Sequence, residues 1–237
     1  MTSFIKNVRN LIFPKLCVFC GKEPVAEEAF VCSDCAFELT KAQGKLCRIC
    51  AHAVHACNCN TPKHLDASKT VFWYNGIVRR LVGTMKDRRY EELFDYAAKR
   101  MCDLIKESEY FISCDVVTFV PRSKKKLSFF GVDPAYQLAK RISENLSIPL
   151  QNYLVCSDKK IDQKELDFKR RRKNAANCFS VSPGTYPFGR ILLVDDVTTT
   201  GATAEECSKV LKKAGAVEVL GIFLAKTHAE KLMAKTS

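Results

Sequence analysis

Long hydrophobic runs are missing from this 237-residue sequence. A membrane-spanning helix needs about 18–20 consecutive apolar residues, whereas the longest clean run, Val219 to Ala225, has only the length of a strand. Residues 1–16 contain no long apolar core and no small-residue cleavage site, so they do not form a secretory signal. Low-complexity segments are also lacking. These absences predict a chain that stays in a reducing compartment and crosses no membrane as a helix.

Acidic residues are also few. The chain has 26 Asp and Glu but 38 Lys and Arg, which gives a formal net charge of +12 and a pI of about 9.1. The remaining composition is ordinary, with 47% hydrophobic, 27% charged and 10% aromatic residues, and it excludes a mainly disordered or collagen-like chain. The excess positive charge favours an anionic partner, which is a nucleic acid, a phosphate-rich ligand or a membrane surface.

Apolar residues near the N-terminus follow a helical period and oppose Lys6, Arg9 and Asn10. These apolar residues are Phe4, Ile5, Val8, Leu11 and Ile12. A stripe of this kind favours a helix that docks on its own domain. The alternative is a helix that lies on a membrane surface.

The 13 cysteines divide the chain unevenly. Eight of them lie between Cys17 and Cys59, and the other five are interpreted as small buried apolar residues. Between Asn60 and Lys69 the sequence changes from a Cys-rich segment to alternating strand-like and helix-like segments. We therefore predict a Cys-rich head with an N-terminal helix over residues 1–65 and a second domain over residues 66–237.

The second domain alternates strand-like and helix-like segments. Strands are expected at residues 70–74, 115–120, 149–155, 190–195 and 217–225, and helices at 76–86, 91–106, 135–145 and 202–213. Several of these strands are apolar on both faces, which is typical of a parallel sheet covered by helices. The prediction is an α/β fold with a mostly parallel sheet flanked by helices.

The head carries its eight cysteines in four close pairs. Two thiolates separated by two residues can reach one tetrahedral ion from a tight turn, and a second pair completes the set. The simplest assignment gives one Zn²⁺ to the first four cysteines and a second to the last four, while an interleaved pairing stays open, as does substitution by His52, His55 or His64. The predicted metal ligands are Cys17, Cys20, Cys32, Cys35, Cys47, Cys50, Cys57 and Cys59. Zinc would fold a segment too small for a core of its own.

The sharpest motif runs from Arg190 to Thr203 and reads RILLVDDVTTTGAT. An apolar strand delivers Asp195 and Asp196, and a turn dense in hydroxyl groups is closed by Gly201 before a helix begins. Backbone N–H groups at a helix N-terminus bind phosphate, and carboxylates at a strand end can accept hydrogen bonds from ribose hydroxyls. The motif therefore predicts a site for a phosphorylated sugar.

This stretch resembles the phosphoribosyl pyrophosphate (PRPP) signature of type I phosphoribosyltransferases. The resemblance implies that Asp195 and Asp196 hold the ribose hydroxyls. It also implies that the following loop binds the 5′-phosphate, and that loop comprises Val197, Thr198, Thr199, Thr200, Gly201, Ala202 and Thr203.

With the Cys-rich head in front, the chain resembles a narrower group, the ComF family of competence proteins, which are amidophosphoribosyltransferase-like and also called GntX-type. Further matching segments are residues 74–90, 115–123 and 163–179, so the resemblance extends from Cys17 to Lys226. It implies a role in natural transformation, with the protein acting on incoming single-stranded DNA at the cytoplasmic face of the inner membrane, alongside other competence proteins.

The resemblance places the pyrophosphate loop at residues 120–126, where Arg122 and Ser123 would contact the pyrophosphate. Lys86 is a further candidate for this contact. The alternative is that residues 120–126 form a solvated basic loop. One stretch departs from the family. Where the family has a sequence like Arg-Gly-Phe-Asn-Gln, Phe130 replaces the arginine and Asp133 the asparagine, so the family roles of those two side chains are not carried over.

Two runs of basic residues are candidates for DNA binding. They consist of Lys124, Lys125, Lys126, Lys169, Arg170, Arg171, Arg172 and Lys173. Cations can follow a nucleic-acid backbone while a neighbouring ring, Phe168 or Phe179, stacks on a base. Such runs can also be solvated faces or can screen pyrophosphate. The net charge favours DNA.

The first functional hypothesis is a competence protein that handles single-stranded DNA and binds PRPP with Mg²⁺ bridging its oxygens. The alternatives are an active phosphoribosyltransferase, which would transfer a pentosyl group to an unknown acceptor, and a PRPP sensor without catalysis.

Overall fold

The computed structural model describes seven segments, which are residues 16–22, 31–41, 64–85, 91–124, 127–128, 131–157 and 178–227. Several predicted features lie outside these segments. They are the N-terminal stripe, the last four cysteines of the head, Lys86, Lys125, Lys126, Phe130 and the basic run 169–173 with Phe168.

A four-stranded parallel sheet forms the centre of the molecule, in the order β1-β6-β5-β2. The strands are β1 (Ala67–Trp73), β6 (Glu218–Lys226), β5 (Arg190–Thr198) and β2 (Val116–Phe119). Leu150 adds one parallel bridge beside Val117 at the outer edge of β2. The two central strands, β5 and β6, are buried on both faces, and the predicted parallel sheet is confirmed.

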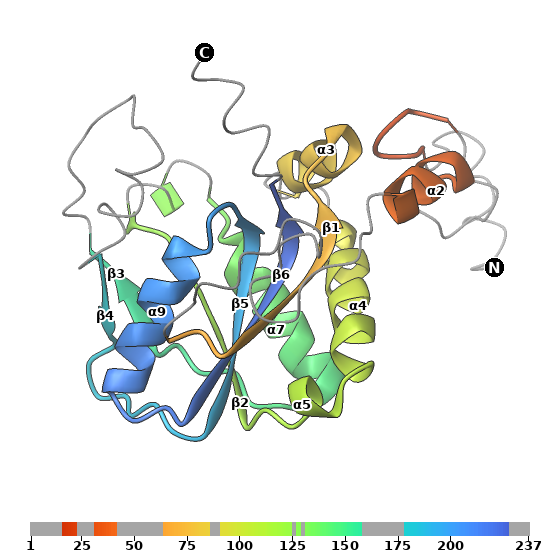
Figure 1. Ribbon diagram of the computed structural model, residues 1–237. Coiled ribbons are helices and arrows are strands. Elements are labelled where there is room, and N and C mark those ends of the chain that lie inside the picture. The colour runs from red at the N-terminus through yellow and green to blue at the C-terminus, as the bar shows by residue number, and fades with distance from the viewer. Residues whose placement is uncertain are drawn as a thin grey trace, which may run out of the picture.

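Helices cover both faces of the sheet, with α9 on one side and α4 and α7 on the other (Figure 1). The described helices are α2 (Ser33–Lys41), α3 (Gly76–Thr84), α4 (Glu92–Lys106), α5 (Glu109–Ile112), α7 (Pro134–Leu146) and α9 (Ala202–Lys213). Even-numbered residues of β5, such as Leu192 and Val194, pack with α4 and α7, whereas Ile191 and Leu193 pack with α9. This alternation follows from the two-residue period of a strand.

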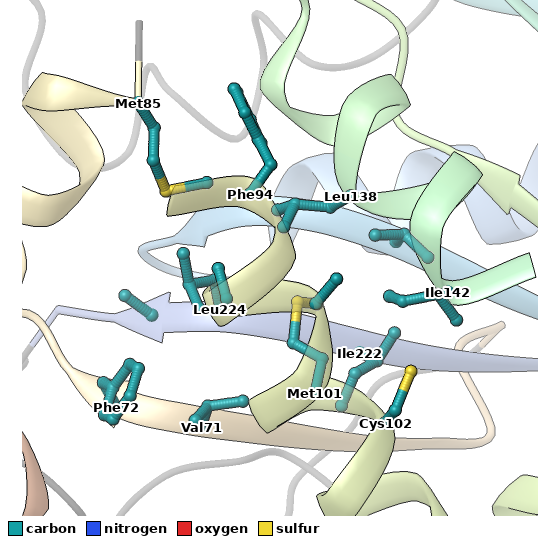
Figure 2. Close-up of a cluster of buried hydrophobic side chains, with 14 of the residues drawn as sticks. Val71, Phe72, Met85, Phe94, Met101, Cys102, Leu138, Ile142, Ile222 and Leu224 are labelled. Atoms are coloured by element: carbon teal, nitrogen blue, oxygen red, sulfur yellow. The ribbon is translucent and has the colours of Figure 1, made fainter. Parts of the chain in front are cut away.

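The larger core cluster lies between β1, β6, α4 and α7. Figure 2 shows Met101 of α4 beside Ile222 of β6, between Leu224 of β6 and Ile142 of α7, and all four are fully buried. Helix α7 begins at Pro134, directly after the N-cap Asp133, an arrangement that favours helix initiation.

The segment 149–155 differs from the strand that we expected there. Its first part makes only the bridge at Leu150, and β3 (Leu154–Cys156) pairs antiparallel with β4 (Phe179–Val181) in a separate two-stranded sheet. Pro149 has no N–H to donate to a ladder. Its carbonyl accepts the Val117 N–H at 2.9 Å, so the chain touches β2 briefly and then turns away.

The segment that joins the head to the sheet is anchored on α9. One carboxylate oxygen of Glu205 accepts the backbone N–H of His64 at 2.8 Å, and the other accepts that of Leu65 at 3.1 Å. The Lys212 ammonium lies 2.6 Å from Asp66. Among the described residues, no helix is long and apolar enough to cross a membrane.

Candidate phosphate and sugar site

The phosphate turn connects β5 to α9. Strand β5 extends to Thr198, beside Lys226 of β6, and therefore continues three residues beyond the Asp195 at which we expected it to end. β-Branched residues such as Val197 and Thr198 favour this extension. The turn itself is short and comprises Thr199, Thr200 and Gly201.

Gly201 shapes the start of α9. Its φ of 77° lies in the left-handed region, which other residues adopt only with strain. The Ala202 N–H donates to Thr200 Oγ1 at 3.2 Å. The first turn of a helix presents N–H groups that have no acceptor within the helix, and these groups bind anions. The turn therefore has the backbone of a phosphate site.

The two acids project to opposite faces of the sheet, because successive strand residues alternate. Asp196 follows Leu192 and Val194 on the α7 face, and its side chain is 12% exposed. Asp195 continues the face that packs on α9. Burial raises the pKa of the Asp195 carboxyl well above its ordinary value of 3.8, and the negative charge of Asp196 raises it further.

Arg122 lies between two carboxylates. Its Nη2 donates to Asp196 Oδ2 at 2.8 Å, and its Nε lies 3.9 Å from Asp133 Oδ1. The Arg122 backbone N–H also donates to Asp133 Oδ2 at 3.3 Å. The structure therefore brings two residues predicted for different parts of one ligand, Arg122 for pyrophosphate and Asp196 for ribose, into direct contact.

Asp133, at which this chain departs from the family pattern, has a clear structural role. Its Oδ1 accepts the N–H groups of Ala135 at 3.1 Å and Tyr136 at 3.4 Å, which caps α7. Burial raises the pKa of Asp133, while the hydrogen bond from Arg122 opposes that rise. The Asp-Pro pair before a helix is an N-cap signal, so the capping role of Asp133 could have been predicted from the sequence. The contact of Asp133 with Arg122 has no such local signal.

The other predicted contacts fall nearby. Ser123 is buried, and its carbonyl accepts the Leu127 N–H at 3.0 Å. Lys124 is exposed and is the one member of the two basic runs that lies within the described segments. Thr203 is exposed at the start of α9.

Asp195→Asn is expected to stabilise the fold at neutral and alkaline pH. The raised pKa means that the folded state holds the ionised carboxylate at a cost, so wild-type stability is greatest below the unfolded pKa of about 3.9 and falls as pH rises through the folded value. Thermal unfolding should show a higher Tm for the variant at pH 8, by about 2–4 °C for each kcal/mol relieved, and no difference near pH 3.5. An equal gain at both pH values would contradict the assignment.

The metal site of the head is formed by Cys17, Cys20, Cys32 and Cys35. Their sulfur atoms lie within 4.8 Å of one another, and Cys20 Sγ is 3.6 Å from Cys32 Sγ. Tetrahedral zinc with sulfur at about 2.3 Å separates its ligands by roughly 3.8 Å. Four thiolates at this spacing fit structural Zn²⁺, and the first of the two predicted ligand sets is brought together.

Local structure explains how the two pairs reach one ion. The Gly21 N–H donates to the Cys17 carbonyl at 2.8 Å, which closes a tight turn around the first pair. Cys32 precedes α2 and Cys35 lies in its first turn, so the second pair sits at a helix N-terminus. Burial opposes ionisation of Cys17, but backbone N–H groups of Cys32, Phe19 and Cys20 lower its pKa to about 6.

The fold and the sites define a class of protein: a Cys-rich head whose four thiols fit zinc, followed by a parallel α/β domain with a phosphate-type turn after β5. The double zinc ribbon domain family matches residues 8–64, which include all eight cysteines of the head.

Two curated proteins are similar to part of the chain. Competence protein F of Haemophilus influenzae is 42% identical over 92 residues, covering 38% of this chain and 40% of that protein. Orotate phosphoribosyltransferase of Pyrococcus abyssi is 28% identical over 130 residues, or 53% of this chain and 69% of the enzyme. The match therefore spans less than half the length of the competence protein.

Among solved structures, purine phosphoribosyltransferase from Pyrococcus horikoshii is 24% identical, with a TM-score of 0.36 over 56% of this chain and 72% of the enzyme. These matches agree with the predicted resemblance: parts of the chain are similar to a competence protein and to a phosphoribosyltransferase, and residues 8–64 match the double zinc ribbon family.

Proposed function

We propose that this chain is a competence-type protein that binds PRPP in its phosphoribosyltransferase-like domain and handles single-stranded DNA. The name of its Haemophilus influenzae relative, Competence protein F, supports the competence-type role. The division into a head over residues 1–65 and a PRPP domain over residues 66–237 is part of the same proposal.

The observation that carries the PRPP site is the 2.8 Å contact between Arg122 and Asp196. A ligand that joins a ribose to a diphosphate needs a carboxylate for the hydroxyls and a cation for the diphosphate within one sugar's reach. The contact places both groups side by side, at the end of β5 and next to the Gly201 turn. When PRPP binds, its diphosphate oxygens would replace Asp196 as acceptors of the hydrogen bonds that Arg122 donates.

In this proposal, Asp195 and Asp196 accept from the ribose hydroxyls and residues 197–203 hold the 5′-phosphate. Arg122 and Ser123 contact the diphosphate, with Lys86 as a further contact. Mg²⁺ is a hard cation that binds phosphate oxygens and few protein ligands. It would offset the charge that PRPP brings next to the two acids.

The DNA half of the proposal is supported by charge. The chain has a formal net charge of +12, and exposed Lys124 begins the first of its two basic runs. Contacts of these cations with phosphates would release counterions, so the affinity for a single strand should fall steeply with salt.

The PRPP site is tested with an isosteric double variant, Asp195→Asn with Asp196→Asn. Amide groups keep the shape of the site but lose the charge that strengthens hydrogen bonds from ribose. We expect an affinity for PRPP, measured by calorimetry with Mg²⁺, that is lower by about a hundredfold.

The matched control is Asp103→Asn with Glu107→Gln, which removes the same charge from two exposed positions at the end of α4. It should bind PRPP as the wild type does. Equal affinities in the wild type and the site variant would discard the PRPP site.

A further inference from the structure

A cavity of about 630 Å³ lies beside the phosphate and sugar site, on the far side of Arg122. Its walls come from the first turns of α4 and α7, the end of β2 and strand β3. None of residues 195–203 lines it, so it is a separate space that shares only the Arg122 loop with the proposed PRPP site. Its volume is in the range of pockets for small organic ligands.

Aromatic rings form much of the wall. Phe119 and Tyr136 pack edge to face with centroids 5.3 Å apart, and Phe94 of α4 also lines the cavity. The Arg141 guanidinium lies 5.3 Å from the Phe94 ring centre and fixes it from behind. Phe94 and Phe119 are only 2% and 7% exposed, so Tyr136, which is 38% exposed, supplies the ring on which a flat ring system can stack.

Amides and cations are among the polar groups of the wall. Gln137 Oε1 accepts from Arg141 Nη1 at 2.7 Å, so its NH₂ group is the part that can donate to a ligand. Asn152 adds an exposed amide. Arg122 and Lys124 bring positive charge. Amides bind the edges of nucleobases, and cations bind the phosphate that accompanies them.

Acidic groups also line the cavity, but one of them is already engaged. Asp133 is held by Arg122 and by the N-terminus of α7. Glu91 lies at the start of α4, and its carboxylate can accept a hydrogen bond from the amino group of a base. The two cations of the wall, Arg122 and Lys124, balance Glu91 and Asp133 in formal charge, so the wall combines a stacking ring, amide donors and an acceptor.

We propose that this cavity is a nucleobase pocket, which receives one unstacked base of a single strand. The inference rests on the DNA half of the proposed function and names the part of the ligand that is held. The ligand chemistry, a flat heteroaromatic base, could also be supplied by a free nucleoside, and the experiment separates the two sources.

The test fills the cavity with Val155→Trp in the full-length, zinc-loaded protein. Val155 lines the cavity from β3 and is 37% exposed. The first probe is a labelled oligothymidylate of about 16 nucleotides, and the second is an abasic strand of equal length. By anisotropy, the variant should bind the oligothymidylate about tenfold more weakly than wild type and the abasic strand equally well, because base stacking is lost while backbone contacts remain.

Two further variants keep the result interpretable. Val217→Trp makes the same change at a position that is 69% exposed and outside the cavity wall, and it should bind both strands like wild type. Tyr136→Leu removes a stacking ring without adding bulk and should reproduce the loss, which guards against misfolding of the Trp variant.

Thymidine and deoxyadenosine form the second arm of the test. If either nucleoside binds wild type and not Val155→Trp while strand affinity is unchanged, the pocket holds a base from a small molecule. If no variant alters the binding of strand or nucleoside, the pocket proposal is overturned. Wild-type protein that binds no strand at all would instead refute the DNA half of the proposed function, and the nucleosides would then decide the pocket.

Discussion

Cys32→Ser is expected to remove one zinc ion from the protein and to unfold the described part of the head. The serine hydroxyl is a poor replacement for a thiolate in a four-sulfur site, and structural Zn²⁺ contributes on the order of 10 kcal/mol to the folding of such segments. Phe19 and Leu39 of the head pack in the larger core cluster with residues of α3, so unfolding of the head should uncover that side of α3. Metal analysis and limited proteolysis should show one zinc ion fewer and new cleavage in the head.

The control for this change is Cys156→Ser, which removes a partly exposed thiol outside the cluster. It should leave the zinc content unchanged. In wild type, a chelator should produce at least the cleavages that Cys32→Ser shows without it, because it removes the same zinc ion. Full zinc content in Cys32→Ser would show that this thiol is not a ligand.

The strands and helices that could be predicted were those whose ends carry a local signal. Helix α9 begins after Gly201 and ends before Gly215, and the expected range, 202–213, is the observed one. The apolar runs in β5 and β6 indicated a parallel sheet because both faces had to be covered. The small sheet of β3 and β4 was not predictable, since each strand has three residues and their pairing joins distant parts of the chain.

The site was foreseen as a list of residues but not as a set of contacts. A motif indicates which side chains meet a ligand, whereas contacts between those side chains depend on the spacing of β2 and β5 in the folded sheet. The pairing of Arg122 with Asp196 and the cap formed by Asp133 are contacts of this kind. The cavity behind Arg122 was likewise hidden, because its walls come from four separate elements.

The same contacts give the second large effect, which is expected for Arg122→Met. The guanidinium is 18% exposed and faces Asp196 and Asp133, whose side chains are 12% and 10% exposed. Removing it leaves two buried carboxylates without this cation, beside an Asp195 whose pKa is already raised by burial and by Asp196. Breaking a buried ion pair from one side costs about 3–5 kcal/mol, and urea unfolding should show a loss of that size.

Rescue separates electrostatics from packing. Arg122→Met combined with Asp196→Asn should recover much of the lost free energy of unfolding, because a neutral amide no longer needs the cation. Arg122→Lys should recover less, since one ammonium cannot reproduce a planar fork between two carboxylates. If the double variant is as unstable as Arg122→Met alone, packing of the guanidinium rather than its charge stabilises this part of the sheet. The ion pair would then not be the reason why these acids can remain buried beside a site proposed to bind an anion.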